Sequence, residues 1–229
     1  MTLNINNNLL KKNNNIINSL REKIRRIENK EIEVIPSSLG KHKYNKAILP
    51  KVISLDFQQI DPALPWHGLP ISGLHEIYGD VISGIGFSTA LIVKASKIYE
   101  EKNIRPQILW CQKENDLCAQ GFYEFGVDPN NLIIAKCANS NDVLWAMEEG
   151  LRSNCLTAVV GKIDKISSIA GKRLQLASEN AATMGILIRN SLNNSFSGNS
   201  PTLTKWRVNP SPNFQNTNIR TNHPRWNLE

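Results

Sequence analysis

Strand signals and helix signals alternate along the chain, and this alternation limits the fold more than any other feature. Short apolar runs predict five strands, at residues 73–78, 107–111, 132–135, 156–160 and 184–188. Apolar residues at helical spacing predict helices between them, at 87–102, 116–125, 140–151 and 168–182. This order is typical of a mostly parallel central sheet with helices on both faces. The sequence therefore predicts an α/β fold.

Two further segments alternate apolar and polar residues with the period of a strand. Val52–Phe57 predicts a strand before the main series, and Thr202–Val208 predicts an antiparallel edge strand after it. The segment 61–70, between Val52–Phe57 and the strand at 73–78, is rich in Pro and Gly, which predicts a loop. Residues 191–200 are rich in Ser, Asn and Gly and also predict a loop.

The positive charge lies mainly near the N-terminus. The formal net charge is +7, and residues 1–46 hold ten Lys or Arg against four Glu. Within them, residues 16–31 combine a helical apolar spacing with basic residues, which predicts a basic amphipathic helix. Such an arm suits nucleic acid or an acidic partner, or is a solvated tail. We divide the chain into an Asn-rich tail, helix and linker (1–46), a core (47–210) and a C-terminal tail (211–229).

Composition limits the remaining classes. No apolar run approaches the length that crosses a bilayer, and the N-terminus has no signal-peptide pattern, so we expect a cytoplasmic protein without a membrane partner. Cys111, Cys118, Cys137 and Cys155 form no CxxC pair and have no histidine at metal-ligand spacing. The sequence therefore predicts four buried, reduced thiols and no metal site.

The turn between the first core strand and its helix has the spacing of a phosphate-binding loop. The pattern G-x-x-x-x-G-K-[ST] wraps phosphates with backbone N–H groups, and its Lys and Ser/Thr hold the phosphates and magnesium. Here Gly79, Ser83 and Gly84 are kept, but Ile85 replaces the lysine and Gly86 the hydroxyl residue. The loop either binds phosphate through its backbone alone or is an inherited, inactive site. We expect the second, with no ATP as cofactor.

A second part of the same machinery is also missing. A P-loop enzyme needs an acidic residue at the end of a later strand, where it holds magnesium. The residue after Val160 is Gly161, and Asp164 lies three positions further on. Because two independent parts are absent, we expect no catalytic residue.

Several segments resemble known families. Glu76–Gly79 with Ser83-Gly84 resembles the start of the RecA nucleotide-binding core, and Gln112-Lys113-Glu114 resembles the segment with the RecA catalytic glutamate. A closer resemblance, over roughly residues 55–229, is to the ImuA family of RecA/SulA-like accessory proteins. The segments that carry it are 60–65 with 68–70, 74–76, 109–111, 144–152 (LWAMEEGLR), 158–161, 173–177, 204–208 and 224–226.

This resemblance implies a RecA-like P-loop fold and a role in the SOS response to DNA damage. The family takes part in mutagenesis by translesion synthesis, together with ImuB, an inactive relative of the Y-family polymerases, and with an error-prone C-family DNA polymerase. It also implies action near DNA, at the nucleoid. Glu114 would be the counterpart of the catalytic glutamate, but without a bound γ-phosphate an activating carboxylate has no use.

Without a catalytic site, function is expected at the surface. Candidate DNA contacts are Lys162, Lys165, Lys172 and Arg173, which are equally explained as solvated helix residues. Candidate partner contacts are Trp145, Glu148, Glu149, Arg152, Trp206 and Trp226. Glu148, Glu149 and Arg152 are expected on the outer face of the helix at 140–151. The alternative for Trp145 is packing in the core or an interface, and the alternative for Trp206 is packing on an edge strand.

Three functions follow from these expectations. The first is a non-catalytic adaptor in damage-induced translesion synthesis. The second is a cell-division inhibitor of the SulA kind, and the third is a RecA-like ATPase with a divergent loop.

Overall fold

The structure is a computed structural model that describes residues 52–56, 59–115, 117–181, 183–190, 201–212 and 224–229. The basic helix and linker expected within 1–46 lie outside the described residues, as does the loop expected at 191–200.

A seven-stranded sheet forms the centre of the described part, in the order β5-β4-β6-β7-β3-β8-β9. Every neighbouring pair is parallel except β8 and β9, which are antiparallel. The strands are β3 (Gly73–Gly79), β4 (Ile108–Gln112), β5 (Leu132–Lys136), β6 (Ala158–Lys162), β7 (Met184–Asn190), β8 (Thr204–Pro210) and β9 (Trp226–Leu228). A separate antiparallel pair joins β1 (Val52–Ile53) and β2 (Leu69–Pro70).

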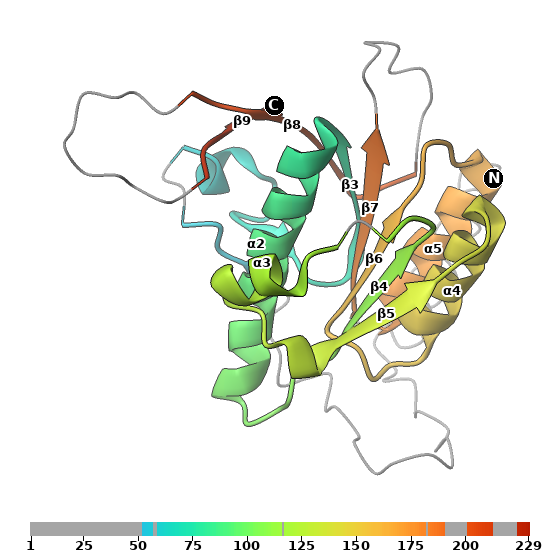
Figure 1. Cartoon of the computed structure of the whole chain (residues 1–229). Coiled ribbons are helices and arrows are strands. Elements are labelled where there is room, and N and C mark those ends of the chain that lie inside the picture. Colours follow the sequence, from blue (N-terminus) through green and yellow to red (C-terminus); the bar gives the residue numbers. More distant parts are fainter. Residues whose placement is uncertain (1–51, 57–58, 116, 182, 191–200, 213–223) are drawn as a thin grey trace, which may run out of the picture. The chain divides into compact units, whose positions relative to one another are not determined.

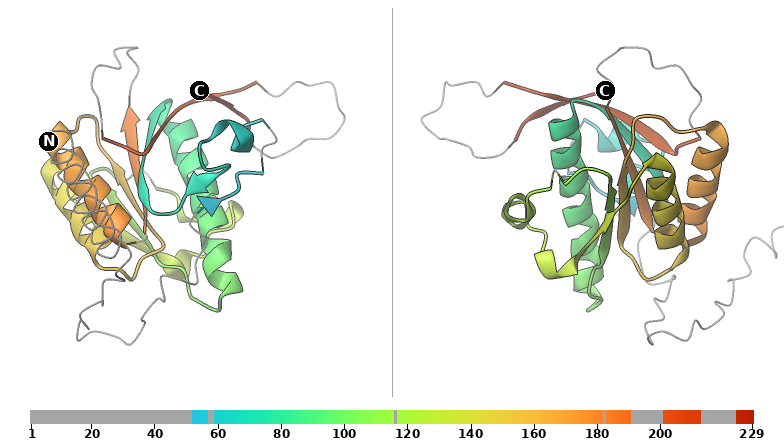
Figure 2. Two further views of the ribbon diagram at one scale, coloured as in Figure 1. Left: turned by 180° about the vertical axis from the view of Figure 1, so that it is seen from behind. Right: turned by 45° about the vertical axis from the view of Figure 1, so that its right-hand side comes forward.

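Helices cover both faces of the sheet (Figures 1 and 2). The long helix α2 (Val81–Glu101) and the short α3 (Ala119–Glu124) lie on one face, and α4 (Ser140–Arg152) and α5 (Ser168–Ala181) lie side by side on the other. Two 3-10 turns, η1 (Asp61–Ala63) and η2 (Pro129–Asn131), complete the connections. The α/β fold class predicted from the alternation is confirmed.

Each face of the sheet has its own apolar core, because successive strand residues point to opposite sides. On the α2 side, Ile77, Phe87 and Trp110 are buried together, and Trp110 meets Phe122 of α3 at a ring-centroid distance of 5.1 Å. On the α4 and α5 side, Met147 is fully buried beside residues of β6 and α5.

The predicted element boundaries need several corrections. Of the strand predicted at Val52–Phe57, the described residues form a strand at Val52–Ile53, and Asp56 has a φ of 60°, which extended pairing does not allow. Phe57 lies outside the described residues. The helix predicted at 116–125 begins only at Ala119. The N-cap of α4 is Asn139, whose side chain accepts hydrogen bonds from the backbone N–H groups of Asn141 and Asp142.

The strand predicted at Thr202–Val208 also differs from the expectation. It is β8, and it lies inside the sheet, parallel to β3, whereas β9 forms the edge. An alternating pattern gives the side-chain period but not the direction of a strand, so the pattern could not distinguish the two arrangements.

Helix α2 bears on the prediction that no apolar run reaches membrane-spanning length. Among the described residues, it alone is long and apolar enough by composition to cross a membrane. Half of its most apolar window is buried against the sheet, as in the core helix of a folded domain.

Candidate functional site

The start of α2 is where a nucleotide phosphate is expected in a fold of this kind. The helix begins at Val81, directly after β3, and Asp80 is its N-cap. The carboxylate of Asp80 accepts a hydrogen bond from the backbone N–H of Ser83 at 2.8 Å, and its carbonyl accepts one from Gly84 N–H at 2.8 Å. Ser83, Gly84 and Gly86 therefore lie within the first turns of the helix, and the turn predicted over Gly79–Gly86 is wrong in its extent.

Gly79 has a structural reason for being glycine. Its φ is 121°, and a Cβ there would lie 2.5 Å from the carbonyl oxygen of Val208 in β8. The next residue, Asp80, donates its N–H to the same carbonyl at 3.1 Å. Close approach of β8, without any bound phosphate, is enough to require glycine at this position.

Gly86 faces an aromatic side chain from the C-terminal strand. A Cβ at Gly86 would lie 3.1 Å from the ring of Trp226 and 3.6 Å from that of Phe125. Trp226 also packs edge-on against Phe87, with ring centroids 5.7 Å apart. The position where a phosphate-binding loop carries its magnesium-binding hydroxyl is therefore covered by β9.

Trp206 and Trp226, both expected at a partner surface, contact the core instead. Trp206 is 6% exposed, stacks at a tilt on Phe87 at 5.7 Å, and donates its ring N–H to Thr204 Oγ1 at 2.8 Å. Trp226 is half-buried against the same cluster. Trp206 therefore lies in the core on the α2 side of the sheet, and Trp226 packs against that core.

The position of the missing magnesium-side acid is filled by a neighbouring side chain. Strand β6 extends to Lys162, two residues beyond its predicted end, and Gly161 lies within it. A Cβ at Gly161 would meet the sulfur of Met147 at 2.1 Å. Met147 of α4 thus occupies the space that an aspartate at this position would need.

Glu114, the counterpart of a catalytic glutamate, is held by an ion pair. Its carboxylate lies 3.0 Å from the ammonium of Lys162 at the end of β6. A second, looser pair joins Lys113 to Asp164 at 3.8 Å. The two pairs connect the segment after β4 to the end of β6 and the segment that follows it, at the carboxyl edge where ligands bind in open α/β sheets.

The four candidate DNA contacts do not form one free basic surface. Lys162 pairs with Glu114, and Arg173 lies 2.7 Å from Glu148. Lys165, which follows β6, and Lys172, on α5, are exposed. The set therefore divides into two exposed lysines, Lys165 and Lys172, and two cations held in ion pairs, Lys162 and Arg173.

The candidate partner contacts on α4 fall into two groups. Trp145 is 66% exposed, and Glu149 and Arg152 are exposed as well. Glu148, expected on the outer face, is only 6% exposed and binds both Arg152, at 2.5 Å, and Arg173 of α5. We call the outer side of these two helices the α4–α5 surface: Trp145, Glu149, Arg152, Ile169, Lys172, Arg173 and Leu176.

Two exposed apolar residues of this surface are absent from the sequence expectations. Ile169 is 74% exposed and Leu176 is 58% exposed, and both lie on the outer side of α5. Their spacing of seven residues places them on one helix face, and this spacing was the sequence signal that could have identified them. Large exposed apolar side chains beside arginines are typical of protein interfaces.

A buried network of polar side chains near β3 was also not predicted from the sequence. His75 is fully buried, and its Nε2–H donates to the carbonyl of Pro70 at 2.9 Å, so its Nδ1 accepts from the hydroxyl of Thr204 at 2.8 Å. Burial lowers the pKa of His75 to about 4, against a smaller opposing effect of the Pro70 hydrogen bond. This histidine is neutral and joins β3, β2 and β8.

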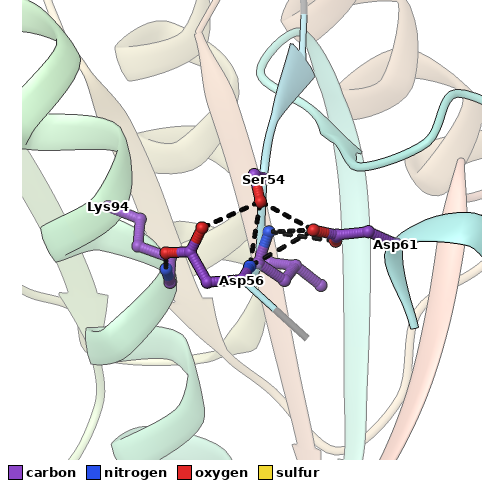
Figure 3. A network of polar contacts seen from close by, with 5 residues as sticks. Ser54, Asp56, Asp61 and Lys94 are labelled. Atoms are coloured by element: carbon purple, nitrogen blue, oxygen red, sulfur yellow. Dashed lines mark hydrogen bonds and ion pairs between the residues drawn. The ribbon is translucent and has the colours of Figure 1, made fainter. Parts of the chain in front are cut away.

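A carboxylate network fastens the segment before η1 to α2 (Figure 3). Asp61 accepts hydrogen bonds from the backbone N–H of Leu55 at 3.0 Å and from the Ser54 hydroxyl at 2.7 Å. Asp56 forms an ion pair with Lys94 in the middle of α2, and this hydrogen bond is the largest cause that lowers the pKa of Asp56. Lys94 therefore points to Asp56 and does not replace the lysine of a phosphate-binding loop.

No cluster of three or more His, Cys, Asp or Glu suited to a metal ion occurs among the described residues. The four cysteines are free thiols, and burial raises the pKa of Cys111 to about 12. Cys118 and Cys155 are exposed, so burial was wrongly expected for them.

Comparisons with known proteins test the resemblance to the ImuA family. No protein-family model matches the chain. The ImuA proteins of two strains of Caulobacter vibrioides, NA1000/CB15N and ATCC 19089/CB 15, are each 26% identical to it over 190 residues, which cover 78% of this chain and 77% of theirs. The crystal structure of SulA from Pseudomonas aeruginosa aligns with 52% of this chain and 98% of its own, with 15% identity and a TM-score of 0.43. The similarity to the two Caulobacter proteins confirms the resemblance of this chain to the ImuA family.

Proposed function

We propose that this chain is a non-catalytic accessory protein of damage-induced translesion DNA synthesis. The observation that carries the proposal is the closed start of α2, where the carboxylate of Asp80 takes the hydrogen bond that a phosphate would accept. A helix N-terminus attracts anions through its unpaired N–H groups and its dipole. An aspartate already bound there repels a nucleotide and removes a donor.

The surroundings of the helix start support the same conclusion. Trp226 covers Gly86, Met147 fills the space beside Gly161, and the counterpart of the catalytic glutamate is paired with Lys162. The first two contacts fill the places of groups that phosphoryl transfer needs, and the third holds the glutamate in an ion pair. The surrounding α/β frame is nevertheless complete, which supports a role as a binding scaffold.

The similarity to ImuA proteins supports the cellular setting. We propose that the partners are an ImuB-like inactive Y-family polymerase relative and an error-prone C-family DNA polymerase, in the cytoplasm and at the nucleoid. The α4–α5 surface is the proposed contact, with Trp145 at its centre. We propose Lys165 and Lys172 as the contacts to DNA, since both are exposed.

Affinity capture tests the proposal with the ImuB-like protein of the same organism. We expect the full chain to retain that protein and Trp145→Ala to lose at least about tenfold in affinity, as for a central interface tryptophan. Tyr123→Ala is the matched control, because Tyr123 is 68% exposed on α3, on the opposite face of the sheet.

Deletion of the gene that encodes this chain is expected to abolish damage-induced mutation. The proposal would be contradicted if the chain failed to capture the polymerase relative and if its deletion left damage-induced mutation unchanged. Filamentous cells on overexpression, together with direct binding of FtsZ, would favour the cell-division inhibitor instead.

A further inference from the structure

Three large apolar side chains of the α4–α5 surface are exposed to water. Trp145 on α4 is 66% exposed, and Ile169 and Leu176 on α5 are 74% and 58% exposed. Burial of apolar surface is favourable, so monomeric proteins seldom keep several large apolar side chains in water on neighbouring elements. Their grouping on two adjacent helices therefore indicates contact with another protein.

The exposed side chains form two stripes of equal length. Ile169 and Leu176 are seven residues apart on α5, and Trp145 and Arg152 are seven residues apart on α4. Seven residues make two helical turns, so each pair spans about 10 Å on one face of its helix. Because both helices return the chain between parallel strands and lie side by side, the stripes run in the same direction (Figure 1). A partner helix with apolar residues at the same spacing fits this surface.

A positive charge lies between the two stripes. The carboxylate of Glu148, which is 6% exposed, holds one guanidinium group from each helix. Nη2 of Arg173 lies 3.0 and 2.7 Å from its two oxygens, and Nη2 of Arg152 lies 2.5 Å from one of them. One carboxylate neutralises one of these two cations, and both arginine side chains are more than half exposed. The surplus charge, with free guanidinium donors, suits a carboxylate of the partner.

The other charges of this surface leave it weakly positive. Its ionisable side chains are three cations and two carboxylates: Arg152, Lys172, Arg173, Glu148 and Glu149. Two further carboxylates lie toward the helix ends and already accept hydrogen bonds, Asp142 from Asn139 and Glu179 from Gln175. Charge complementarity at the centre of the surface therefore favours an acidic partner segment.

Nucleic acid is the other class of partner that arginines bind. Contacts to a phosphate backbone come from cations and N–H donors, which leaves no role for Ile169 and Leu176. Single-stranded bases stack on successive aromatic rings, and Trp145 is the one aromatic residue of α4 and α5. The exposed aliphatic side chains therefore favour a protein. Because Lys172 lies between Ile169 and Leu176, a bound helix leaves Lys165 as the proposed contact to DNA.

We propose that the α4–α5 surface binds an acidic amphipathic helix of the partner. One carboxylate of this helix binds Arg152, and its apolar side chains cover Trp145, Ile169 and Leu176. The inference rests on the proposed function and adds the chemistry of the segment that is bound.

The affinity of charge variants of the full chain for the ImuB-like polymerase relative tests the proposal. Arg152→Gln should weaken binding by about fivefold, and it leaves Glu148 paired with Arg173. Glu149→Gln should strengthen binding by about twofold, because it removes a charge that repels an acidic helix. Lys97→Gln is the matched control and should change nothing, since Lys97 is exposed on α2, on the opposite face of the sheet. Circular dichroism of each variant separates loss of binding from loss of folding.

The outcomes distinguish this inference from the proposed function. No binding by the wild-type chain would overturn both. Binding that Trp145→Ala weakens, but that Arg152→Gln leaves unchanged or Glu149→Gln weakens, would overturn the acidic helix alone. A single-stranded oligonucleotide that binds the wild-type chain and is lost in both Trp145→Ala and Arg152→Gln would assign the surface to nucleic acid instead.

Discussion

The carboxylate of Asp80 caps α2 by accepting the N–H of Ser83 at 2.8 Å. This contact stabilises the longest described helix with the same N–H group that could otherwise donate to a phosphate. Substitution of Asp80 therefore tests both the cap and the proposed closure of this site.

Asp80→Ala should lower the free energy of unfolding by about 1 kcal/mol, because the first turn of α2 loses its capping acceptor. Urea denaturation measures the change. Asp80→Asn keeps a capping oxygen and should be close to the wild type. Equal stability of the alanine variant and the wild type would show that the cap is unimportant.

Gly161→Ala should destabilise the protein by about 1–3 kcal/mol, because the new methyl group meets the sulfur of Met147 and the core must shift. The control is Gly121→Ala in α3, where the nearest atom would be 3.9 Å from the new Cβ. Thermal or urea unfolding of both variants checks the difference. A neutral Gly161→Ala would mean that Met147 does not fill this position tightly.

The buried pair of Glu76 and Arg189 offers a third test. Glu76 in β3 is fully buried and lies 2.5 Å from the guanidinium of Arg189 in β7. Arg189→Met should cost about 3–5 kcal/mol, because a buried carboxylate loses its ion-pair partner. Lys94→Met, which leaves the largely exposed Asp56, should cost much less than Arg189→Met, because water solvates the carboxylate that remains. Similar losses in the two variants would contradict this account.

The sequence predicted the sheet well but the start of α2 poorly, for identifiable reasons. Buried strands such as β4 and β6 are continuous apolar runs, which are recognisable without any partner. The glycines at 79, 84 and 86 suggested a turn, but Gly79 serves the approach of β8 and Gly86 the packing of Trp226. Both reasons depend on residues more than 100 positions away, which local patterns cannot reveal.

The candidate surface residues also depend on contacts between elements that local sequence patterns do not reveal. Helical spacing placed Glu148 on the outer face of α4, yet α5 lies beside it and brings Arg173 to its carboxylate. The position of one helix next to another is set by the crossover connections and not by the spacing within either helix. Trp145 was left open between core and surface, and its exposure favours the surface.

The stability of the protein should depend on pH through His75. Its folded pKa of about 4 lies below the usual value of 6.5, so the unfolded chain binds a proton that the folded chain does not. Stability should therefore fall as the pH drops from about 6.5 to about 4, by about 3 kcal/mol in total from this group. Urea denaturation across this range measures the slope. His75→Gln removes the titrating group and should flatten it, whereas an unchanged slope would assign the effect to other groups.

Isothermal titration calorimetry with ATP and magnesium tests the central claim most directly. The closed start of α2 predicts no specific binding to the full chain at millimolar nucleotide. It predicts the same for Asp80→Ala, because Ile85 and Gly86 still lack the groups that hold the phosphates and the metal. Micromolar binding that Gly84→Asp abolishes would contradict the account and identify the chain as a nucleotide-binding protein.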